Sequence, residues 1–195
     1  NYLGIGSNGV VTAKNKLLIH TLYRSAAEAI SFRKNGLEVS SSTTSDDRLW
    51  RLQLNGYQGN NQTSDVVIPE AITYNSDLSA LELNKVEAYL AFKYGLTLDP
   101  TLNYISAAGT TFWDNTGATN TGYKNNVFGI GRDYAFSLLK QSQARYYDSP
   151  KIVVHLGTLQ TLNSANTSLD AVADDNFVMF GDNGMLGITN FNLSL

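Results

Sequence analysis

Aromatic side chains in the second half of the chain could bind a sugar ring. Tyrosine and tryptophan combine an apolar ring with a polar tip, as binding surfaces often do. If residues 146 and 147 lie in one strand, these two tyrosines point to opposite faces, and at least one of them is then exposed. Packing in the core is the alternative, which we prefer for the tryptophan. The candidate platform consists of Trp113, Tyr123, Tyr134, Tyr146 and Tyr147, and all of these except Tyr134 are our predicted ligand-binding residues.

Acidic residues in turns form the second set of residues that could bind a ligand, in this case a metal ion. A hard cation such as calcium requires oxygen ligands from carboxylates and carbonyls. No stretch follows the spacing of an EF-hand loop, and solvated turn residues are the alternative reading of each acid. Calcium is therefore the one cofactor that we carry forward. The loop candidates are Asp46, Asp47, Asp65, Asp174, Asp175, Asp182 and Asn183, of which Asp46, Asp47 and Asp182 are the predicted metal ligands.

Residues for catalysis are not arranged in any recognisable pattern. His20 and His155 both lie in apolar, strand-like runs without a second histidine or a carboxylate at ligand spacing, so we interpret them as packed or edge-facing strand residues. Sugar-cleaving jelly rolls use paired carboxylates, which would occur here as Glu-x-Asp-x-x-Glu, and the sequence lacks that motif. The chain has no cysteine, which excludes thiol catalysis and disulfides. We therefore expect a protein that is not an enzyme.

The composition argues against two classes of partner, namely nucleic acids and membranes. The 195 residues carry a net charge of -3 and only 16% charged side chains, whereas nucleic-acid binding calls for a basic face. No apolar run approaches the roughly 20 residues that span a bilayer, so we expect no membrane insertion. The first ten residues lack the pattern of a signal peptide, and both ends read as interrupted strands. We expect the chain to be an excerpt of a longer protein.

One amphipathic helix is predicted near residues 79–94. Ser79 followed three positions later by Glu82 is the arrangement of a capping box, and Gly95 stands where a left-handed C-terminal residue is wanted. The apolar residues recur at helical spacing and should face a core. They are Leu83, Val86 and Leu90.

The rest of the sequence is typical of short strands and turns. Residues 29–39 predict a hairpin around Asn35-Gly36, and residues 66–74 predict a strand in which Pro69 indicates an edge or a bulge. Further short apolar runs alternate with turn residues up to the end of the chain. This pattern predicts a mainly β fold, an antiparallel β-sandwich of jelly-roll type with one helix.

A strand-and-helix motif runs from Val66 to Asp99. Its strand ends in Tyr74-Asn75, Leu78-Ser79 follows, and its helix ends in Tyr-Leu-Ala-x-Lys-Tyr-Gly. This motif resembles the last strand and closing helix of laminin-G-like, or concanavalin A-like, jelly rolls, in particular the copies in large cell-surface proteins of Bacteroidota. The next stretch resembles the uncharacterised module that accompanies them. The motifs that carry this second resemblance are FWDNT at 112–116, FGIGRD at 128–133, Gln141-Ser142 and FVMFGD at 177–182.

The resemblance implies two modules and an extracellular role. Residues 1–97 would be the jelly-roll portion that ends in the helix, and residues 98–195 a second β-rich module packed on it or continuous with it. The implied protein is secreted or on the cell surface, and adhesive or scaffold-like. We therefore expect a non-catalytic module that binds a glycan or a protein on a surface. The alternative is a spacer or assembly domain that contacts neighbouring domains of the same large protein, and a jelly-roll glycoside hydrolase is less favoured.

Overall fold

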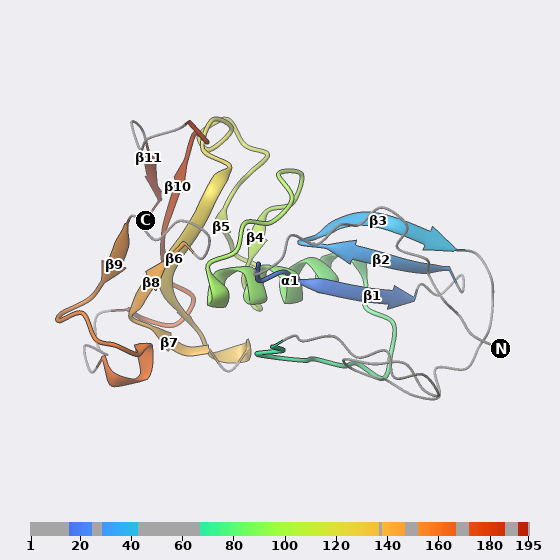
Figure 1. The fold of residues 1–195 in the computed structure, drawn as a ribbon, viewed down its shortest axis with the longest axis horizontal. Helices are drawn as coiled ribbons and strands as arrows, with labels where there is room; N and C mark the ends of the chain where they lie inside the picture. Colours follow the sequence, from blue (N-terminus) through green and yellow to red (C-terminus); the bar gives the residue numbers. More distant parts are fainter. Residues whose placement is uncertain are drawn as a thin grey trace.

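The computed structural model describes residues 16–24, 29–42, 67–136, 138–146, 152–166, 172–185 and 191–194. Within these residues the chain is mainly β, with antiparallel sheets and a single α-helix (Figure 1). The predicted fold class is thereby confirmed, and the arrangement is consistent with a β-sandwich-like fold. The finer jelly-roll topology stays a prediction.

The strands of the described residues form four antiparallel sheets. The three-stranded sheet has the order β1-β2-β3 and the four-stranded sheet the order β11-β10-β6-β7, while β4 pairs with β5 and β8 with β9. Short 3₁₀ helices follow β6 and β9. The bounds are β1 His20–Arg24, β2 Ile30–Lys34, β3 Leu37–Ser42, β4 Tyr104–Ile105, β5 Thr111–Trp113, β6 Asn125–Asp133, η1 Tyr134–Phe136, β7 Leu138–Gln141, β8 Gln143–Arg145, β9 Val153–His155, η2 Asn163–Ala165, β10 Phe177–Asp182 and β11 Phe191–Ser194.

The predicted hairpin is present as β2 and β3. Lys34 and Leu37 are its last paired residues, and the two residues between them both have positive φ, 49° at Asn35 and 88° at Gly36. Asparagine and glycine tolerate this left-handed backbone better than other residues, and the resulting turn matches the twist of the two strands. The Asn-Gly pair therefore fixes the position of the hairpin.

The helix α1, Ala80–Tyr94, has the predicted ends. The Glu82 backbone N–H donates to Ser79 Oγ at 3.3 Å, and the Ser79 N–H donates to Glu82 Oε2 at 2.7 Å, which completes the capping box. Gly95 ends the helix with φ 63°. These contacts satisfy backbone groups that every helix leaves without an internal partner, so the sequence determines where α1 starts and stops.

The buried face of α1 differs in part from the predicted one. Leu83 is buried as expected, but Val86 and Leu90 are only half-buried. Ala88, Ala91 and Phe92 are the most deeply buried apolar residues of the helix instead, in a hydrophobic core that the helix shares with the surrounding strands. Figure 1 shows α1 between the three-stranded and the four-stranded sheet. The other buried members of this core are Ile19, Tyr89, Leu96, Leu98, Tyr104, Trp113, Val127, Leu138, Phe177 and Met179.

This core continues across the predicted boundary between residues 97 and 98. Helix residues on one side of the boundary pack in the same cluster as strand residues on the other side, such as Phe92 with Phe177, whose ring centroids lie 5.4 Å apart. The division into two modules stays a prediction, with the two parts in continuous contact.

The strand expected over residues 66–74 is wrong for the described residues 67–74, which form no strand. Val67 is 87% exposed, and the apolar side chains of Ile72 and Tyr74 are also largely exposed. Residues with high β-propensity favour a strand when they can pack on a half-buried sheet. The described residues provide no neighbouring strand on which this segment could pack. The described residues also contain no helix long and apolar enough to cross a bilayer.

Candidate functional site

The predicted aromatic platform does not form as a unit. Trp113 is only 1% exposed, and its indole Nε1 donates to Asn115 Oδ1 at 3.0 Å, so neither face of the ring can reach a sugar. The assignment of Trp113 as a ligand-binding residue is therefore wrong, because its large apolar surface is used in the core. Tyr123 is partly buried against the same core. Tyr146 is half-buried and interacts within the chain, and Tyr147 lies outside the described residues.

The acids predicted to bind calcium give no metal site in the described part of the chain. The Asp182 carboxylate accepts a short hydrogen bond from the Asn126 amide and a second from the Gly184 N–H at 2.8 Å, so it stabilises a turn. No group of three or more potential ligands among His, Cys, Asp and Glu occurs within the described residues. Asp46 and Asp47 lie outside them. Calcium binding therefore stays a prediction.

Instead, the structure brings three separate segments together where β6 ends, a place that we call the β6 corner. It consists of Arg132, Tyr134, Asp174, Asp175 and Thr110. The Asp175 N–H donates to the Arg132 carbonyl at 3.1 Å, and the Tyr134 N–H donates to Asp174 Oδ1 at 2.9 Å. The Thr110 hydroxyl donates to Asp175 Oδ2 at 2.5 Å. Pairing of β6 with β10 thus places an arginine, a tyrosine and two aspartates side by side.

An arginine and a tyrosine are stacked at the β6 corner. The Arg132 guanidinium carbon lies 4.0 Å from the centroid of the Tyr134 ring, in cation–π geometry. Tyr134 is 47% exposed. The described residues give the guanidinium no hydrogen bond or ion pair, and its Nε is shut away from solvent without a partner. The corner therefore presents a half-exposed aromatic ring, one side of which is covered by an arginine without a hydrogen bond or ion pair to the described residues.

Arg132 forms no ion pair with its neighbour Asp133 among the described residues. Asp133 is buried, and its Oδ2 accepts a hydrogen bond from the Ala107 N–H at 2.9 Å. Neighbouring residues in a strand point to opposite faces, so the two side chains diverge. The Arg132 side chain accordingly lies against Tyr134 and not against Asp133.

Asp175 adds an acceptor to the β6 corner. Its backbone φ is 58°, which is uncommon for a residue other than glycine, and its carboxylate Oδ1 is buried without a partner. A buried polar atom that lacks a hydrogen bond costs about 1–3 kcal/mol. The corner therefore holds one buried donor, Arg132 Nε, and one buried acceptor, Asp175 Oδ1, that have no hydrogen-bond partner.

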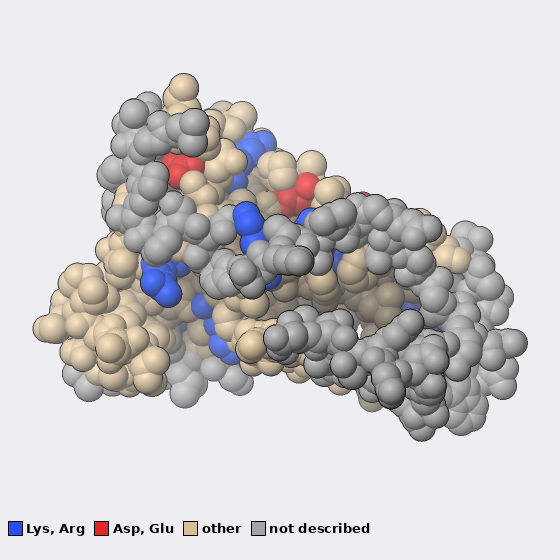
Figure 2. Space-filling model, viewed as in Figure 1, with Lys and Arg blue, Asp and Glu red and all other residues tan. Residues whose placement is uncertain are grey.

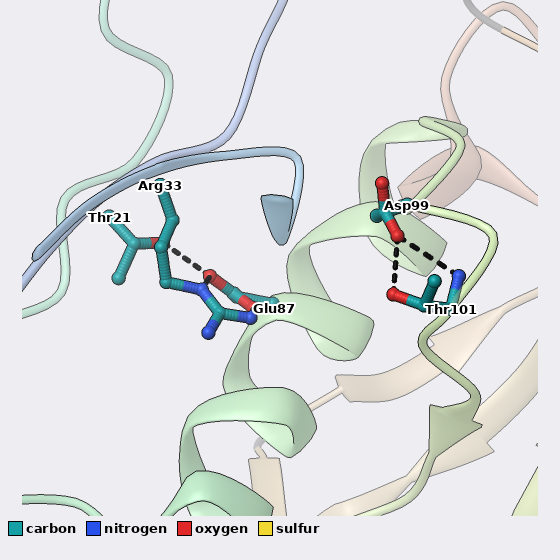
Figure 3. Close-up of polar contacts among 5 residues, drawn as sticks. All are labelled: Thr21, Arg33, Glu87, Asp99 and Thr101. Carbon is teal, nitrogen blue, oxygen red and sulfur yellow. Dashed lines mark hydrogen bonds and ion pairs between the residues drawn. The ribbon is translucent and has the colours of Figure 1, made fainter. Parts of the chain in front are cut away.

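A second polar cluster joins the three-stranded sheet to α1. Figure 3 shows Arg33 of β2 and Thr21 of β1 both directed at Glu87 on the helix. Arg33 Nε and Nη2 lie 3.0 and 2.9 Å from the two carboxylate oxygens, and the Thr21 hydroxyl donates to Oε1 at 2.8 Å. No local sequence pattern predicts this cluster, because Arg33 and Glu87 lie 54 positions apart. Glu87 is fully buried, and both of its carboxylate oxygens accept hydrogen bonds in these contacts.

The turn of the same hairpin is held by the chain that leaves the helix. The Asp99 N–H donates to the Asn35 carbonyl at 2.8 Å, and the Asn35 Oδ1 accepts from the Ile19 N–H at 2.9 Å. The Asp99 side chain in turn accepts from the Thr101 N–H at 3.0 Å (Figure 3). These backbone contacts fix the sheet against α1 together with the ion pair.

A third cluster lies at the C-terminal end of α1. The Glu70 carboxylate accepts hydrogen bonds from Tyr89, Lys93 and Tyr94 at 3.0, 2.8 and 2.9 Å. Partial burial would raise the pKa of Glu70, but these bonds outweigh it and hold that pKa below its ordinary value. Burial and the bond to Glu70 raise the pKa of Tyr94 to about 12. The cluster therefore fastens the segment that contains Glu70 to the helix.

Charge is spread thinly over the molecule. In the view of Figure 2, the described Lys and Arg side chains form several separate spots, and the Asp and Glu side chains lie apart from one another. This face thus offers no continuous basic or acidic area among the described residues, in keeping with the low net charge.

Comparison with known proteins identifies a family. No curated protein and no solved structure matches the chain. A family model described as a domain of unknown function, DUF8202, matches residues 82–193, which is more than half of the sequence. The whole β6 corner lies within the matched residues, whereas Arg33 and Glu70 lie before them. The chain therefore belongs to the DUF8202 family.

Proposed function

We propose that the chain is a non-catalytic binding module of a secreted or cell-surface protein, and that it binds a glycan or protein ligand at the β6 corner. One observation carries this proposal: Tyr134 is half-exposed, and it is stacked on the Arg132 guanidinium, which has no hydrogen bond or ion pair to the described residues. Tyrosine and arginine are enriched where proteins bind partners, because they combine contact area with directed hydrogen bonds. The surface location rests on the resemblance of residues 66–99 to laminin-G-like modules.

The backbone of the corner supports a binding role. Hydrogen bonds from the Tyr134 and Asp175 N–H groups join the ends of β6 and β10, so the aromatic ring and the carboxylates are held in place without a ligand. A site that is ordered in advance loses less conformational entropy on binding. The corner thus suits recognition of a ligand from solution or from a surface.

An adhesion assay tests this proposal. Beads coated with the full chain are washed over polysaccharides, over a glycoprotein and over the same glycoprotein after its glycans are removed. We expect the wild-type chain to be retained on at least one surface, and a variant with Arg132→Met and Tyr134→Ala to be released. The matched control carries Arg145→Met and Tyr74→Ala, which change an exposed arginine and an exposed tyrosine elsewhere. Retention on none of the surfaces, or equal retention of the corner variant, would contradict the proposal.

A spacer or assembly domain is the second candidate, and the buried contact between Arg33 and Glu87 favours it. This pair and the Thr21 bond tie two strands to the helix, as a module that carries mechanical load would require. Force spectroscopy on the full chain between marker domains tests the idea. We expect a distinct unfolding peak that weakens in Glu87→Gln, and extension without a peak would rule this role out.

A further inference from the structure

We propose that residues 67–77 form a strap that opens and closes on α1 while the rest of the fold stays intact, and that the Glu70 carboxylate holds the strap closed. The strap runs up to the start of the helix, and Figure 1 draws it in teal. It is a different part of the chain from the β6 corner, so the inference goes beyond the proposed function and does not depend on it.

The strap is attached to the described residues by one side chain. Glu70 alone is not exposed among residues 67–77, and it alone forms hydrogen bonds to the described residues. Burial of apolar side chains does not replace these bonds, since Val67, Ile72 and Tyr74 are 87, 39 and 50% exposed. Ordering a segment costs conformational entropy, which buried surface or bonds must offset. The closed position of the strap therefore depends on Glu70.

The site on α1 that receives Glu70 is built without the strap. Its donors are the hydroxyls of Tyr89 and Tyr94 and the ammonium group of Lys93, which also donates to Tyr89 Oη at 2.7 Å. Tyr89 is only 9% exposed, and its ring is stacked on that of Phe136 with the centroids 5.2 Å apart. Opening the strap thus breaks the three bonds to Glu70 and leaves the helix in place. The two phenols and the ammonium group then become available to the carboxylate of another molecule.

The capping box sets the point about which the strap turns. The Ser79 N–H donates to Glu82 Oε2 at 2.7 Å, and the Glu82 N–H donates to Ser79 Oγ at 3.3 Å, so the start of α1 is fixed whether the strap is open or closed. Residues 75–77 lie just before this cap and are exposed. Hinges commonly consist of a few such residues at the end of an element.

The contact that closes the strap is weak enough for both forms to be populated. The side chains of Lys93 and Glu70 are 34 and 22% exposed, and a partly exposed ion pair stabilises a structure only slightly. The closed form therefore exceeds the open form by a small factor, and a change in one partner shifts the balance measurably.

A distance measurement between two spin labels in the full chain tests the inference. The chain has no cysteine, so Ile72→Cys in the strap and Ala118→Cys in an exposed turn provide the only attachment sites. Double electron–electron resonance should resolve a closed and an open population. Glu70→Gln in this labelled chain should raise the ratio of open to closed about threefold, because the amide carries no charge for Lys93. Lys93→Met removes the cation instead and should have a similar effect.

Glu38→Gln is the matched control, since Glu38 is an exposed carboxylate on β3. It should change the ratio by less than about 1.5-fold. Amide hydrogen exchange in α1 and β6, measured on the same variants, should stay slow, because the strap opens without the core. A single distance that Glu70→Gln and Lys93→Met leave unchanged would overturn the inference. So would an equal shift in the control, or a loss of protection in α1 and β6 that accompanies the opening.

Discussion

Arg33 in β2 and Glu87 in α1 form an ion pair in which Nη2 lies 2.9 Å from Oε2. The Glu87 side chain is 0% exposed and the Arg33 side chain 18%, so the carboxylate depends on its protein partners in place of water. The Thr21 hydroxyl supplies the third bond to it, at 2.8 Å. Because these partners come from β1 and β2, Glu87 is satisfied only when the three-stranded sheet is docked on the helix.

Replacing Glu87 by glutamine should therefore destabilise the whole fold. Glu87→Gln keeps the shape of the side chain but leaves Arg33 without its counter-charge, and breaking a buried pair in this way costs about 3 kcal/mol. The free energy of unfolding from urea denaturation measures the loss. Glu38→Gln on β3 is the matched control, because Glu38 is exposed, and it should stay within about 0.5 kcal/mol of wild type. Equal effects of the two substitutions would show that the ion pair is not important for stability.

Two glycines in β6 allow β10 to approach closely. A Cβ on Gly129 would meet the Met179 sulfur and would lie 2.5 Å from the Val178 carbonyl oxygen. On Gly131 it would lie 2.8 Å from the Asn176 carbonyl oxygen. These backbone atoms cannot move aside without breaking the β6–β10 ladder, so the glycines of the FGIGRD motif are required by packing.

Gly129→Ala should accordingly lower the stability by about 3 kcal/mol through overpacking. Gly122→Ala is the control, since a Cβ at Gly122 meets nothing within 4 Å. Thermal unfolding followed by circular dichroism measures both variants. A Gly129→Ala protein as stable as Gly122→Ala would mean that β10 does not lie against β6 as closely as described.

Features set by neighbouring residues were predictable from the sequence. The capping box needs only Ser79 and Glu82, and the hairpin turn needs only Asn35 and Gly36, so both were found in the expected places. The alternation of apolar and polar residues indicated the mainly β class in the same way. In each case the interacting groups are a few residues apart, and no knowledge of the fold is required.

Features that depend on distant pairing were not predictable. Glu87 reads as an ordinary polar helix residue, because its partner Arg33 is 54 positions away. Tyr134 and Asp175 were each noticed in the sequence, yet only the pairing of β6 with β10 makes them neighbours. In the sequence, a tryptophan such as Trp113 suits a core and a sugar-binding platform equally well. Only its burial in the structure distinguishes the two roles. Sequence patterns identify such residues but do not show which of them meet.

The buried phenol of Tyr104 gives a prediction about the core. Its hydroxyl donates to the Leu96 carbonyl at 3.1 Å and accepts from the Leu98 N–H at 3.0 Å, and burial raises the pKa of this phenol. Tyr104→Phe would leave both backbone groups without a partner, which should cost about 1–3 kcal/mol. Tyr74→Phe alters an exposed tyrosine and should have no measurable effect. Urea denaturation of both variants decides this, and a neutral Tyr104→Phe would contradict the described bonds.

The Glu70 cluster should make stability depend on pH in the acid range. Hydrogen bonds from Lys93, Tyr94 and Tyr89 hold the pKa of Glu70 below its ordinary 4.5 in the folded chain. A carboxylate with a lowered folded pKa contributes stability above its unfolded pKa, and this contribution disappears as the pH falls through the folded pKa. Because the cluster is partly exposed, the contribution near neutral pH should be only about 0.5–1 kcal/mol.

Glu70→Gln tests this contribution against a matched variant, Asp77→Asn, which changes an exposed carboxylate a few residues later in the chain. The difference in unfolding free energy between wild type and Glu70→Gln should be largest near neutral pH and should shrink as the pH is lowered below the ordinary pKa of 4.5. Urea denaturation at a series of pH values measures that difference. A difference that stays constant down to the most acidic point, or one that Asp77→Asn reproduces, would mean that the ionised Glu70 carboxylate does not fasten its segment to α1.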